Sequence, residues 1–237
     1  MLRMSQAGIA VGAGLKLLVS TTGPLQGLWD RPGVTHELCN RQALVILRKD
    51  GFVHCADTFE EHLVSLNAGV YWADQGCKNV GHYLDLKADR GLWRFPSAIE
   101  EFRRYFGQAL HHARRYAWSE AAFFLGAAAH LVQDLCVPHH ATVKVFSGHQ
   151  QYEAWVEEHR TGYIVDRCGI YAEGHPSHEL LLKNARLAAE FLESVANGAT
   201  TASYHRATGV LLPQAQRTTA GLFYQFYAAI GAAFKAA

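Results

Sequence analysis

The residues most able to do chemistry lie in the middle of the chain, where His130, Asp134, His140, His149 and Glu153 follow one another closely. His130 and Asp134 are four residues apart, as are His149 and Glu153, and this spacing puts both members of a pair on one face of a helix. Imidazole nitrogens and carboxylate oxygens are the ligands that zinc takes in proteins when cysteine thiolates are absent. The pattern therefore predicts one end of a site for several metal ions.

Each pair, taken alone, has a simpler interpretation. His130 follows the apolar run Phe-Phe-Leu-Gly-Ala-Ala-Ala, so it could form a buried structural pair with Asp134. His149 and Glu153 could form an ordinary pair on the surface of a helix. The occurrence of both pairs in one short segment favours metal binding over two unrelated contacts.

Four further positions are candidate ligands: Trp29, His36, Asp74 and His82. An isolated aspartate at a helix end, such as Asp74, is usually a solvated cap, and a histidine in a glycine-rich loop, such as His82, usually lies on the surface. A charged histidine in the first turn of a helix is unfavourable because of the helix dipole, whereas a neutral, metal-bound His36 would avoid that penalty.

The composition is that of a globular protein with an excess of histidine. The chain has 237 residues, which suits one domain, and 14 histidines, roughly twice what an average composition gives. Its five cysteines form no C-x-x-C pair, so a thiolate zinc site is not expected. The net charge of +1 gives no reason to expect nucleic acid as a partner.

The apolar spacing predicts helices along most of the sequence and almost no strand alternation. Pro138 is expected to end or kink the central helix, and Asp57-Thr-Phe-Glu60 resembles a capping box. The expected helices cover residues 35–49, 57–73, 96–116, 119–134, 149–167, 176–196 and 214–234. The expected fold is therefore all-α, a single compact domain of many helices.

Beyond these patterns, the sequence resembles the bacterial zinc-dependent phospholipase C family, which is related to the S1/P1 nucleases. The resemblance covers the chain from Trp29 nearly to its end. The segments that carry it are Trp29-Asp30 with Gly33-Val-Thr-His36, Gly69-Val-Tyr-Trp-Ala-Asp74, Phe123-Phe-Leu-Gly with His130-x3-Asp134-x5-His140, His149-x3-Glu153, and Ala215-Gln-Arg-Thr-Thr-Ala-Gly221.

The resemblance implies nine ligands for three zinc ions. The first ion would bind Asp74, His82, His130 and Asp134, and the second would bind His140, His149 and Glu153. The third would bind His36 together with the backbone amine and carbonyl of Trp29, and Asp134 would bridge the first and third ions.

The implied activity is that of a phosphoric diester hydrolase acting on phospholipids at a membrane surface. A zinc-activated water would cleave a phosphatidylcholine-type lipid to diacylglycerol and a phosphorylated head group, and Asp74 would serve as general base. Two alternatives stay open at this point: a single-strand nuclease of the S1/P1 type and a non-catalytic helical zinc-binding protein. Glu153 disfavours the nuclease, because that group usually has aspartate there.

Some positions depart from the family pattern. Leu131 stands where tyrosine is usual, Gln133 where glycine or threonine is usual, and Val143 where asparagine is usual. None of the three is an implied ligand, so we expect altered packing and not a lost metal ion. The loop between Asp74 and His82 looks shorter than in members that cleave phosphatidylcholine, which leaves the head-group preference open.

The first part of the chain differs from the rest. Residues 1–28 are interpreted as a signal peptide, a propeptide or a disordered segment, and residues 29–237 as the catalytic domain. Trp29 offers a free amine only if residues 1–28 are removed. The expected location is secreted or at the cell surface, and the expected oligomeric state is a monomer.

Overall fold

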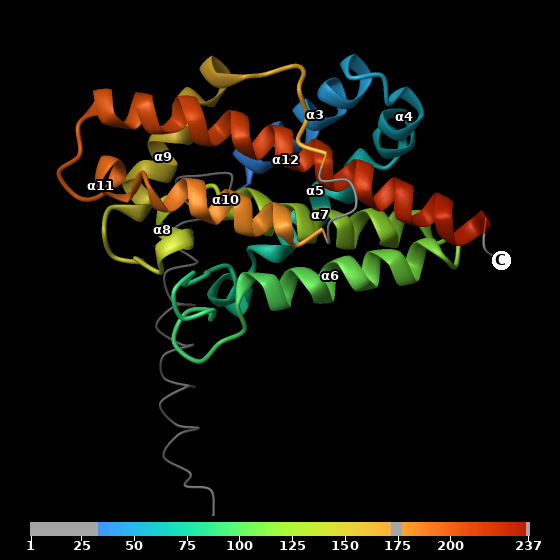
Figure 1. The fold of residues 1–237 in the computed structure, drawn as a ribbon, viewed down its shortest axis with the longest axis horizontal. Helices are drawn as coiled ribbons and strands as arrows, with labels where there is room; N and C mark the ends of the chain where they lie inside the picture. The colour runs from blue at the N-terminus through green and yellow to red at the C-terminus, as the bar shows by residue number, and fades with distance from the viewer. Residues whose placement is uncertain (1–32, 172–176, 236–237) are drawn as a thin grey trace, which may run out of the picture.

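The chain folds into helices in a computed structural model that describes residues 33–171 and 177–235 (Figure 1). In chain order they are α3 (Val34–Lys49), α4 (Val53–Glu61), α5 (Leu63–Ala73), the 3₁₀ helix η1 (Gly76–Gly81), α6 (Ala98–Ala113), α7 (Trp118–Asp134), α8 (Pro138–Thr142), α9 (His149–His159), the 3₁₀ helix η2 (Arg160–Tyr163), α10 (Glu179–Ala189), α11 (Leu192–Val195) and α12 (Thr201–Lys235). Within the described ranges there is no strand, only an isolated bridge between Asp85 and Arg90. The expectation of an all-α domain is confirmed.

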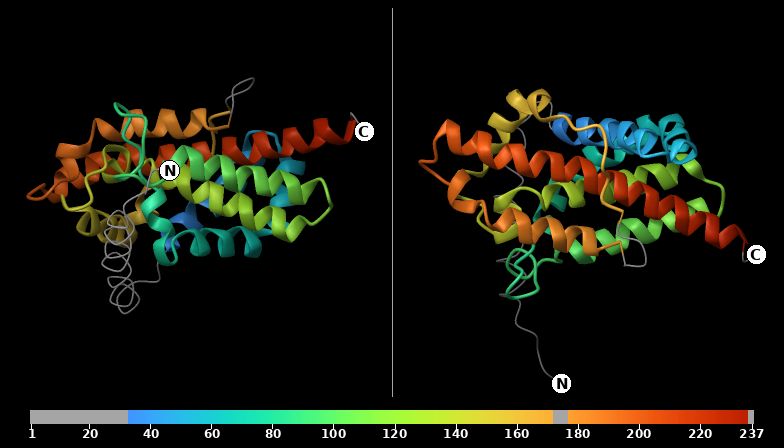
Figure 2. Two further views of the ribbon diagram at one scale, coloured as in Figure 1. Left: turned by 90° about the horizontal axis from the view of Figure 1, so that it is seen from below. Right: turned by 45° about the horizontal axis from the view of Figure 1, so that its top comes forward.

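The helices pack around α7, which is buried along most of its length. α5 and α6 make its most extensive contacts, and α12 packs on α7 and on α3 from another side. Figure 2 shows α6 and α7 side by side, with α12 running along the length of the molecule. The central position of α7 explains its alanine-rich sequence, because small side chains let three neighbouring helices approach it.

Two glycines bring α5 and α7 unusually close together. A β-carbon added at Gly126 would lie 1.9 Å from the carbonyl oxygen of Leu66, and one added at Gly69 would lie 1.8 Å from that of Phe123. Only glycine fits at either position. The close crossing brings the end of α5, where Asp74 lies, next to the end of α7.

The start of α6 follows the sequence prediction. Ser97 precedes the helix and accepts a hydrogen bond from the Glu100 amide, while the Glu100 carboxylate accepts one from the Ser97 amide. This reciprocal capping box satisfies two amide groups that the first turn would leave without partners. α6 therefore begins at a fixed residue, and the loop before it has a fixed end.

The predicted capping box at Asp57 is wrong. Asp57 lies inside α4, which begins at Val53, and its carboxylate accepts a hydrogen bond from Arg48 instead of an amide of its own helix. α5 then follows as a separate helix. α3 begins at Val34, one residue before the expected start, after Gly33 in a left-handed conformation.

Pro138 does not end α7, which already stops at Asp134; it is the first residue of α8. Proline suits that position because the first amide of a helix needs no partner. The helix expected over residues 149–167 ends at His159, and that expected over 176–196 is divided into α10 and α11.

The last helix is much longer than predicted. It begins at Thr201, where Thr200 accepts a hydrogen bond from the Ser203 amide, and it continues through Pro213. Proline usually interrupts a helix, but the packing of α12 keeps the helix continuous at Pro213. No helix in the described ranges is long and apolar enough to cross a bilayer. Residues 1–28 and Trp29 lie outside the described residues.

Candidate metal centre

The Asp134 carboxylate lies between histidines that come from four different parts of the chain. Its Oδ2 lies 2.8 Å from His82 Nδ1 and 3.1 Å from His130 Nε2. Its Oδ1 lies 3.4 Å from His36 Nε2, and His140 Nδ1 lies 3.9 Å from Oδ2. Both oxygens of one carboxylate therefore face separate sets of imidazole nitrogens.

His82 and His130 approach each other as well as Asp134. Their Nδ1 and Nε2 atoms are 3.2 Å apart, so three possible ligand atoms form a triangle with sides of 2.8, 3.1 and 3.2 Å. Ligands bound to one tetrahedral zinc ion at about 2.0–2.1 Å lie about 3.3 Å from each other. The fourth member of this group is Asp74, whose Oδ1 lies 3.9 Å from His130 Nε2.

A second group lies at the start of α9. His149 Nε2 is 2.8 Å from Glu153 Oε1, and His140 Nε2 is 3.4 Å from the same oxygen. The His140 Nδ1 atom lies 3.3 Å from the carbonyl oxygen of His82. A hydrogen bond from Nδ1 to that carbonyl leaves Nε2 free as a ligand, which is how second-shell contacts commonly orient metal-binding imidazoles.

A third group joins the start of α3 to the end of α7. His36, His130 and Asp134 each offer one ligand atom, and these atoms lie within 4.8 Å of one another. The other nitrogen of His36 is 2.8 Å from Gln133 Oε1. Gln133 in turn donates hydrogen bonds to Asn40 and Thr219. A polar network thus holds His36 through its Nδ1 atom, on the side of the ring away from Asp134.

The carboxylates of Asp134 and Glu153 stay ionised among the imidazoles. Burial opposes the charge of Asp134, but the imidazoles of His130 and His140 hold the pKa of that carboxyl well below its usual range. Burial likewise opposes the charge of Glu153, and His149 and His140 outweigh it and lower its pKa. The centre therefore presents two ionised carboxylates, enclosed at Asp134 and partly open at Glu153, and their negative charge attracts cations.

The pKa values of the imidazoles shift in opposite directions. Burial lowers the pKa of His82 and of His36, and neighbouring His130 acts the same way on both. Burial also works against a charged His140, but Asp134 and Glu153 outweigh it and raise its pKa to about 9. The rings thus differ in how readily they give up a proton, as expected of a crowded set that shares two carboxylates.

The residues fit zinc on the chemistry of the donor set. Nitrogen and carboxylate oxygen ligands converge without thiolates, in the numbers that zinc sites use. His82 Nε2 and His130 Nδ1 are buried and have no hydrogen-bond partner among the described residues. The polar contacts that orient these two rings are therefore those with Asp134. A cation bound there would be shared between the two imidazoles and the carboxylate.

The structure brings together eight of the nine residues that the sequence indicated. Trp29 lies outside the described residues, and the other eight form the three groups. Two residues near the site were not found from the sequence. Gln133 accepts a hydrogen bond from His36, and His139 Nε2 donates one to the Ser147 carbonyl. A signal existed for Gln133, since it departs from the family pattern next to Asp134.

The family model described as zinc dependent phospholipase C matches residues 35–208, which is well over half of the chain. No curated protein matches the sequence.

Two solved structures share the fold. The alpha toxin from Clostridium absonum has a TM-score of 0.75 and 20% sequence identity, covering 85% of this chain and 66% of that chain. The alpha-toxin of Clostridium perfringens isolated from avian strain SWCP has a TM-score of 0.68 and 20% identity, covering 83% and 63%. This chain therefore spans less than two thirds of the toxins that it matches. The chain shares the fold of the matched part of these proteins, and by its family match it belongs to the zinc-dependent phospholipase C family.

Proposed function

We propose that the protein is a zinc-dependent phosphodiesterase that hydrolyses phospholipids of the phosphatidylcholine type to diacylglycerol and a phosphorylated head group. The observation that carries this proposal is the position of Asp134, with one oxygen facing His36 and the other facing His82 and His130. A carboxylate between two sets of ligands is suited to bridging two metal ions. Membership of the family supports the choice of substrate.

The ligands divide into three sets in this proposal. Asp74, His82, His130 and Asp134 would hold the first zinc ion, and His140, His149 and Glu153 would hold the second. His36 would hold the third with Trp29, and Asp134 would be shared between the first and third ions. The three groups of converging side chains support this division, and the part of Trp29 stays a prediction from the sequence.

The zinc ions, when bound, supply positive charge that lowers the pKa of a coordinated water and neutralises phosphate oxygens. The chain's own carboxylates would otherwise repel a phosphodiester, which is an anion. Of the two carboxylates around the first zinc ion, Asp74 is better placed to take a proton, because its side chain is 38% exposed while that of Asp134 is 4% exposed. We therefore assign Asp74 as the general base that accepts the proton of the attacking water.

The more open side of the centre lies at Asp74 and Glu153. The Glu153 side chain is 40% exposed, whereas those of His82 and His130 are 1% exposed. A substrate phosphate can reach the centre from this side, and the histidines behind it exclude water from the ligand atoms. The arrangement favours an open catalytic site over a closed structural one.

The test compares phosphatidylcholine vesicles with single-stranded DNA as substrates of the wild-type protein and of His130→Ala. Lipid cleavage that the substitution abolishes, together with reduced zinc content, is the expected result. His111→Ala is the matched control, since His111 is an exposed histidine of α6 and should keep both activity and zinc. Cleavage of DNA without cleavage of lipid would overturn the proposal in favour of the nuclease, and bound zinc without either activity would favour a structural site.

Three zinc ions per chain, a monomeric state and a secreted or cell-surface location stay predictions of this proposal. Sequencing the N-terminus of the natural protein and measuring its metal content test the first and the last together. A mature chain that begins at Trp29 is expected to bind the third ion through its free amine. Size-exclusion chromatography tests the oligomeric state.

A further inference from the structure

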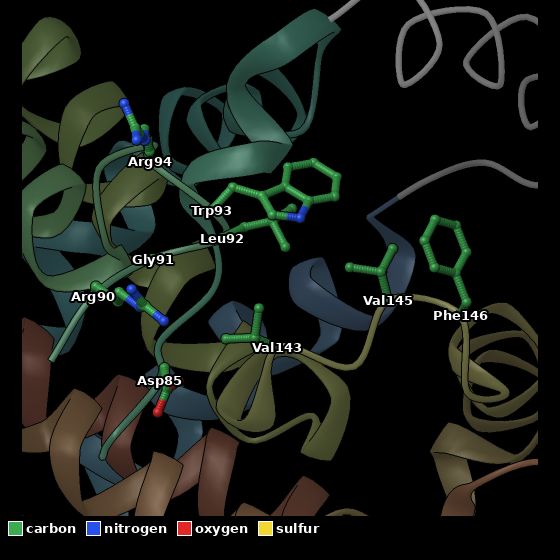
Figure 3. Close-up of a pocket in the computed structure, with 9 residues that line it drawn as sticks. All are labelled: Asp85, Arg90, Gly91, Leu92, Trp93, Arg94, Val143, Val145 and Phe146. Atoms are coloured by element: carbon green, nitrogen blue, oxygen red, sulfur yellow. The ribbon is translucent and has the colours of Figure 1, made fainter. Parts of the chain in front are cut away.

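Two loops beside the candidate metal centre display aromatic side chains to solvent. Trp93 is 45% exposed and Phe146 is 86% exposed. Figure 3 shows Leu92 and Trp93 of one loop facing Val143 and Val145 of the other across a hollow of about 530 Å³. Large exposed aromatics gathered around one hollow are unusual on a monomer and commonly mark a binding surface.

Both loops are tied to the candidate ligands. The first begins directly after His82, and the second links His140 to His149. The Leu84 amide donates a hydrogen bond of 3.0 Å to the His140 carbonyl, and the Tyr83 ring stacks on the His140 ring with centroids 4.6 Å apart. A ligand that covers the loops therefore lies next to the centre.

Backbone contacts fix the conformation of the first loop. The Asp85 amide donates to the Arg90 carbonyl at 2.7 Å, and the Asp85 carboxylate accepts hydrogen bonds from the Lys87 and Ala88 amides. Trp93 has a φ of 53°, a left-handed conformation that a bulky residue rarely adopts. This backbone holds the indole outward, so its exposure is a property of the folded loop.

The second loop is held in the same way. The Lys144 amide donates to the His139 carbonyl at 3.0 Å, and His139 Nε2 donates to the Ser147 carbonyl at 2.9 Å. Asn197 Nδ2 donates to the carbonyl of Phe146 at 3.3 Å. The Phe146 backbone is therefore anchored to two other parts of the protein while its ring projects into solvent.

Cations accompany the aromatic rings. Arg90, Arg94 and Lys144 are exposed, and none of them has an ion-pair partner within the part of the chain that the structure describes. The nearby Asp85 carboxylate is already occupied by backbone amides. Free guanidinium and ammonium groups beside exposed aromatics complement an anionic lipid surface, where rings enter the head-group region and each cation attracts the negative lipids.

We propose that the Trp93 and Phe146 loops, with Arg90, Arg94 and Lys144, form the surface by which the protein docks on an anionic phospholipid bilayer. This inference rests on the proposed function, since it brings the more open side of the centre to lipid head groups. The aromatics supply apolar contact, the cations supply attraction, and the anchored backbone lets them insert without ordering a flexible segment. Docking would thus present a substrate phosphodiester beside the metal centre.

The test measures co-sedimentation of the zinc-loaded protein with phosphatidylcholine vesicles that contain or lack phosphatidylglycerol. Binding is expected to be stronger with phosphatidylglycerol and to weaken with salt. The double variant Trp93→Asn, Phe146→Ser should bind at least about tenfold more weakly, because two aromatic side chains no longer enter the interface. Asparagine is chosen because it tolerates the left-handed backbone at position 93. The double variant Arg90→Gln, Arg94→Gln should lose about fivefold per arginine, on anionic vesicles only.

Val64→Ser is the matched control, since Val64 is 84% exposed on α5 and should leave vesicle binding unchanged. Hydrolysis of a soluble phosphodiester, measured in parallel, separates docking from catalysis. Vesicle binding that needs the loops, in a protein that cleaves no lipid, would uphold docking and overturn only the proposed function. Wild-type protein that binds neither vesicle, or loop variants that bind as well as wild type, would overturn docking. Docking would also be overturned if the two loops proved to form a dimer interface, or if the loop variants no longer cleaved the soluble phosphodiester.

Discussion

Gln133 accepts a hydrogen bond from His36, with 2.8 Å between Gln133 Oε1 and His36 Nδ1. The orientation of the amide is fixed because its Nε2 donates to Asn40 Oδ1 and to Thr219 Oγ1, each at 3.0 Å. In the neutral His36 ring, Nδ1 therefore carries the proton and Nε2 carries a lone pair. That lone pair faces Asp134 Oδ1 at 3.4 Å. A lone pair and a carboxylate oxygen at this distance repel each other unless a cation is shared between them.

Replacing Gln133 by leucine should weaken zinc binding at His36. Without the acceptor on Nδ1 the His36 ring loses its fixed tautomer and orientation, and removal of such a second-shell partner typically weakens metal affinity by about 10- to 100-fold. Competition with a chromogenic chelator measures this as the loss of one class of bound zinc. The free energy of unfolding should also fall by about 1–3 kcal/mol, because buried polar partners lose their donor.

Gln214→Leu is the control for the loss of stability. Gln214 is a partly buried glutamine of α12 that donates to Asn184 Oδ1 at 2.9 Å and touches none of the candidate ligands. It should reduce the free energy of unfolding without changing the zinc titration. If both variants release zinc equally, the support that Gln133 gives to His36 is not specific.

Asp134→Asn and Glu153→Gln should have different effects on metal content. The Asp134 carboxylate contributes oxygens to two groups, so the Asp134→Asn variant should lose zinc from both and should no longer cleave a phosphodiester. Among the described residues the Glu153 carboxylate pairs with His140 and His149, which belong to one group, so Glu153→Gln should affect that group alone. Elemental analysis of the purified variants gives the zinc content per chain. An equal loss in the two variants would contradict the bridging position of Asp134.

The convergence of the central His and acid pairs could be predicted because that information is local. Two pairs at helical spacing and a histidine between them are visible in the sequence, and the helices do place each pair on one face. The contribution of Gln133 could not be predicted in this way. It depends on Asn40 of α3 and Thr219 of α12, which lie far from it in sequence.

The helices could be predicted more readily than their ends. Ser97 marks the start of α6 by a short-range hydrogen bond, and the sequence shows it. Asp57 shows a similar pattern but lies within α4, because tertiary contacts with Arg48 use its carboxylate. The same limit applies to Pro213, where packing of α12 continues a helix through a residue that usually interrupts one. The loops that carry Trp93 and Phe146 had no periodic signal in the sequence.

His139 should make the zinc-free protein sensitive to acid. Burial lowers its pKa to about 4, and its Nδ1 is buried without a hydrogen-bond partner among the described residues. Since the ordinary pKa is about 6.5, the unfolded chain takes up the proton first as the pH falls, and this part of the stability is lost between about pH 6.5 and pH 4. The loss attributable to His139 should be at most about 3 kcal/mol.

Urea unfolding of the chelated protein across that pH interval measures the effect, with His139→Gln as the comparison. Glutamine can still donate to the Ser147 carbonyl but takes up no proton. As the pH falls, the free energy of unfolding of the wild type should therefore drop below that of the variant by a growing amount. Parallel curves for the two proteins would contradict the assignment of the acid sensitivity to His139.

Gly126→Ala should disrupt the crossing of α5 and α7 that brings Asp74 to the centre. The added β-carbon would lie 1.9 Å from the Leu66 carbonyl oxygen, a backbone atom that can move only with its helix, so the free energy of unfolding should fall by about 1–3 kcal/mol or more. Separation of the helices should also reduce zinc content, because Asp74 moves away from His130. Gly107→Ala is the matched control in α6, where nothing lies within 4 Å of the added atom, and it should stabilise the protein by about 0.5–1 kcal/mol. Thermal unfolding of both variants, with zinc analysis, tests the contrast; a Gly126→Ala protein as stable and as zinc-rich as the wild type would show that the close crossing does not position Asp74.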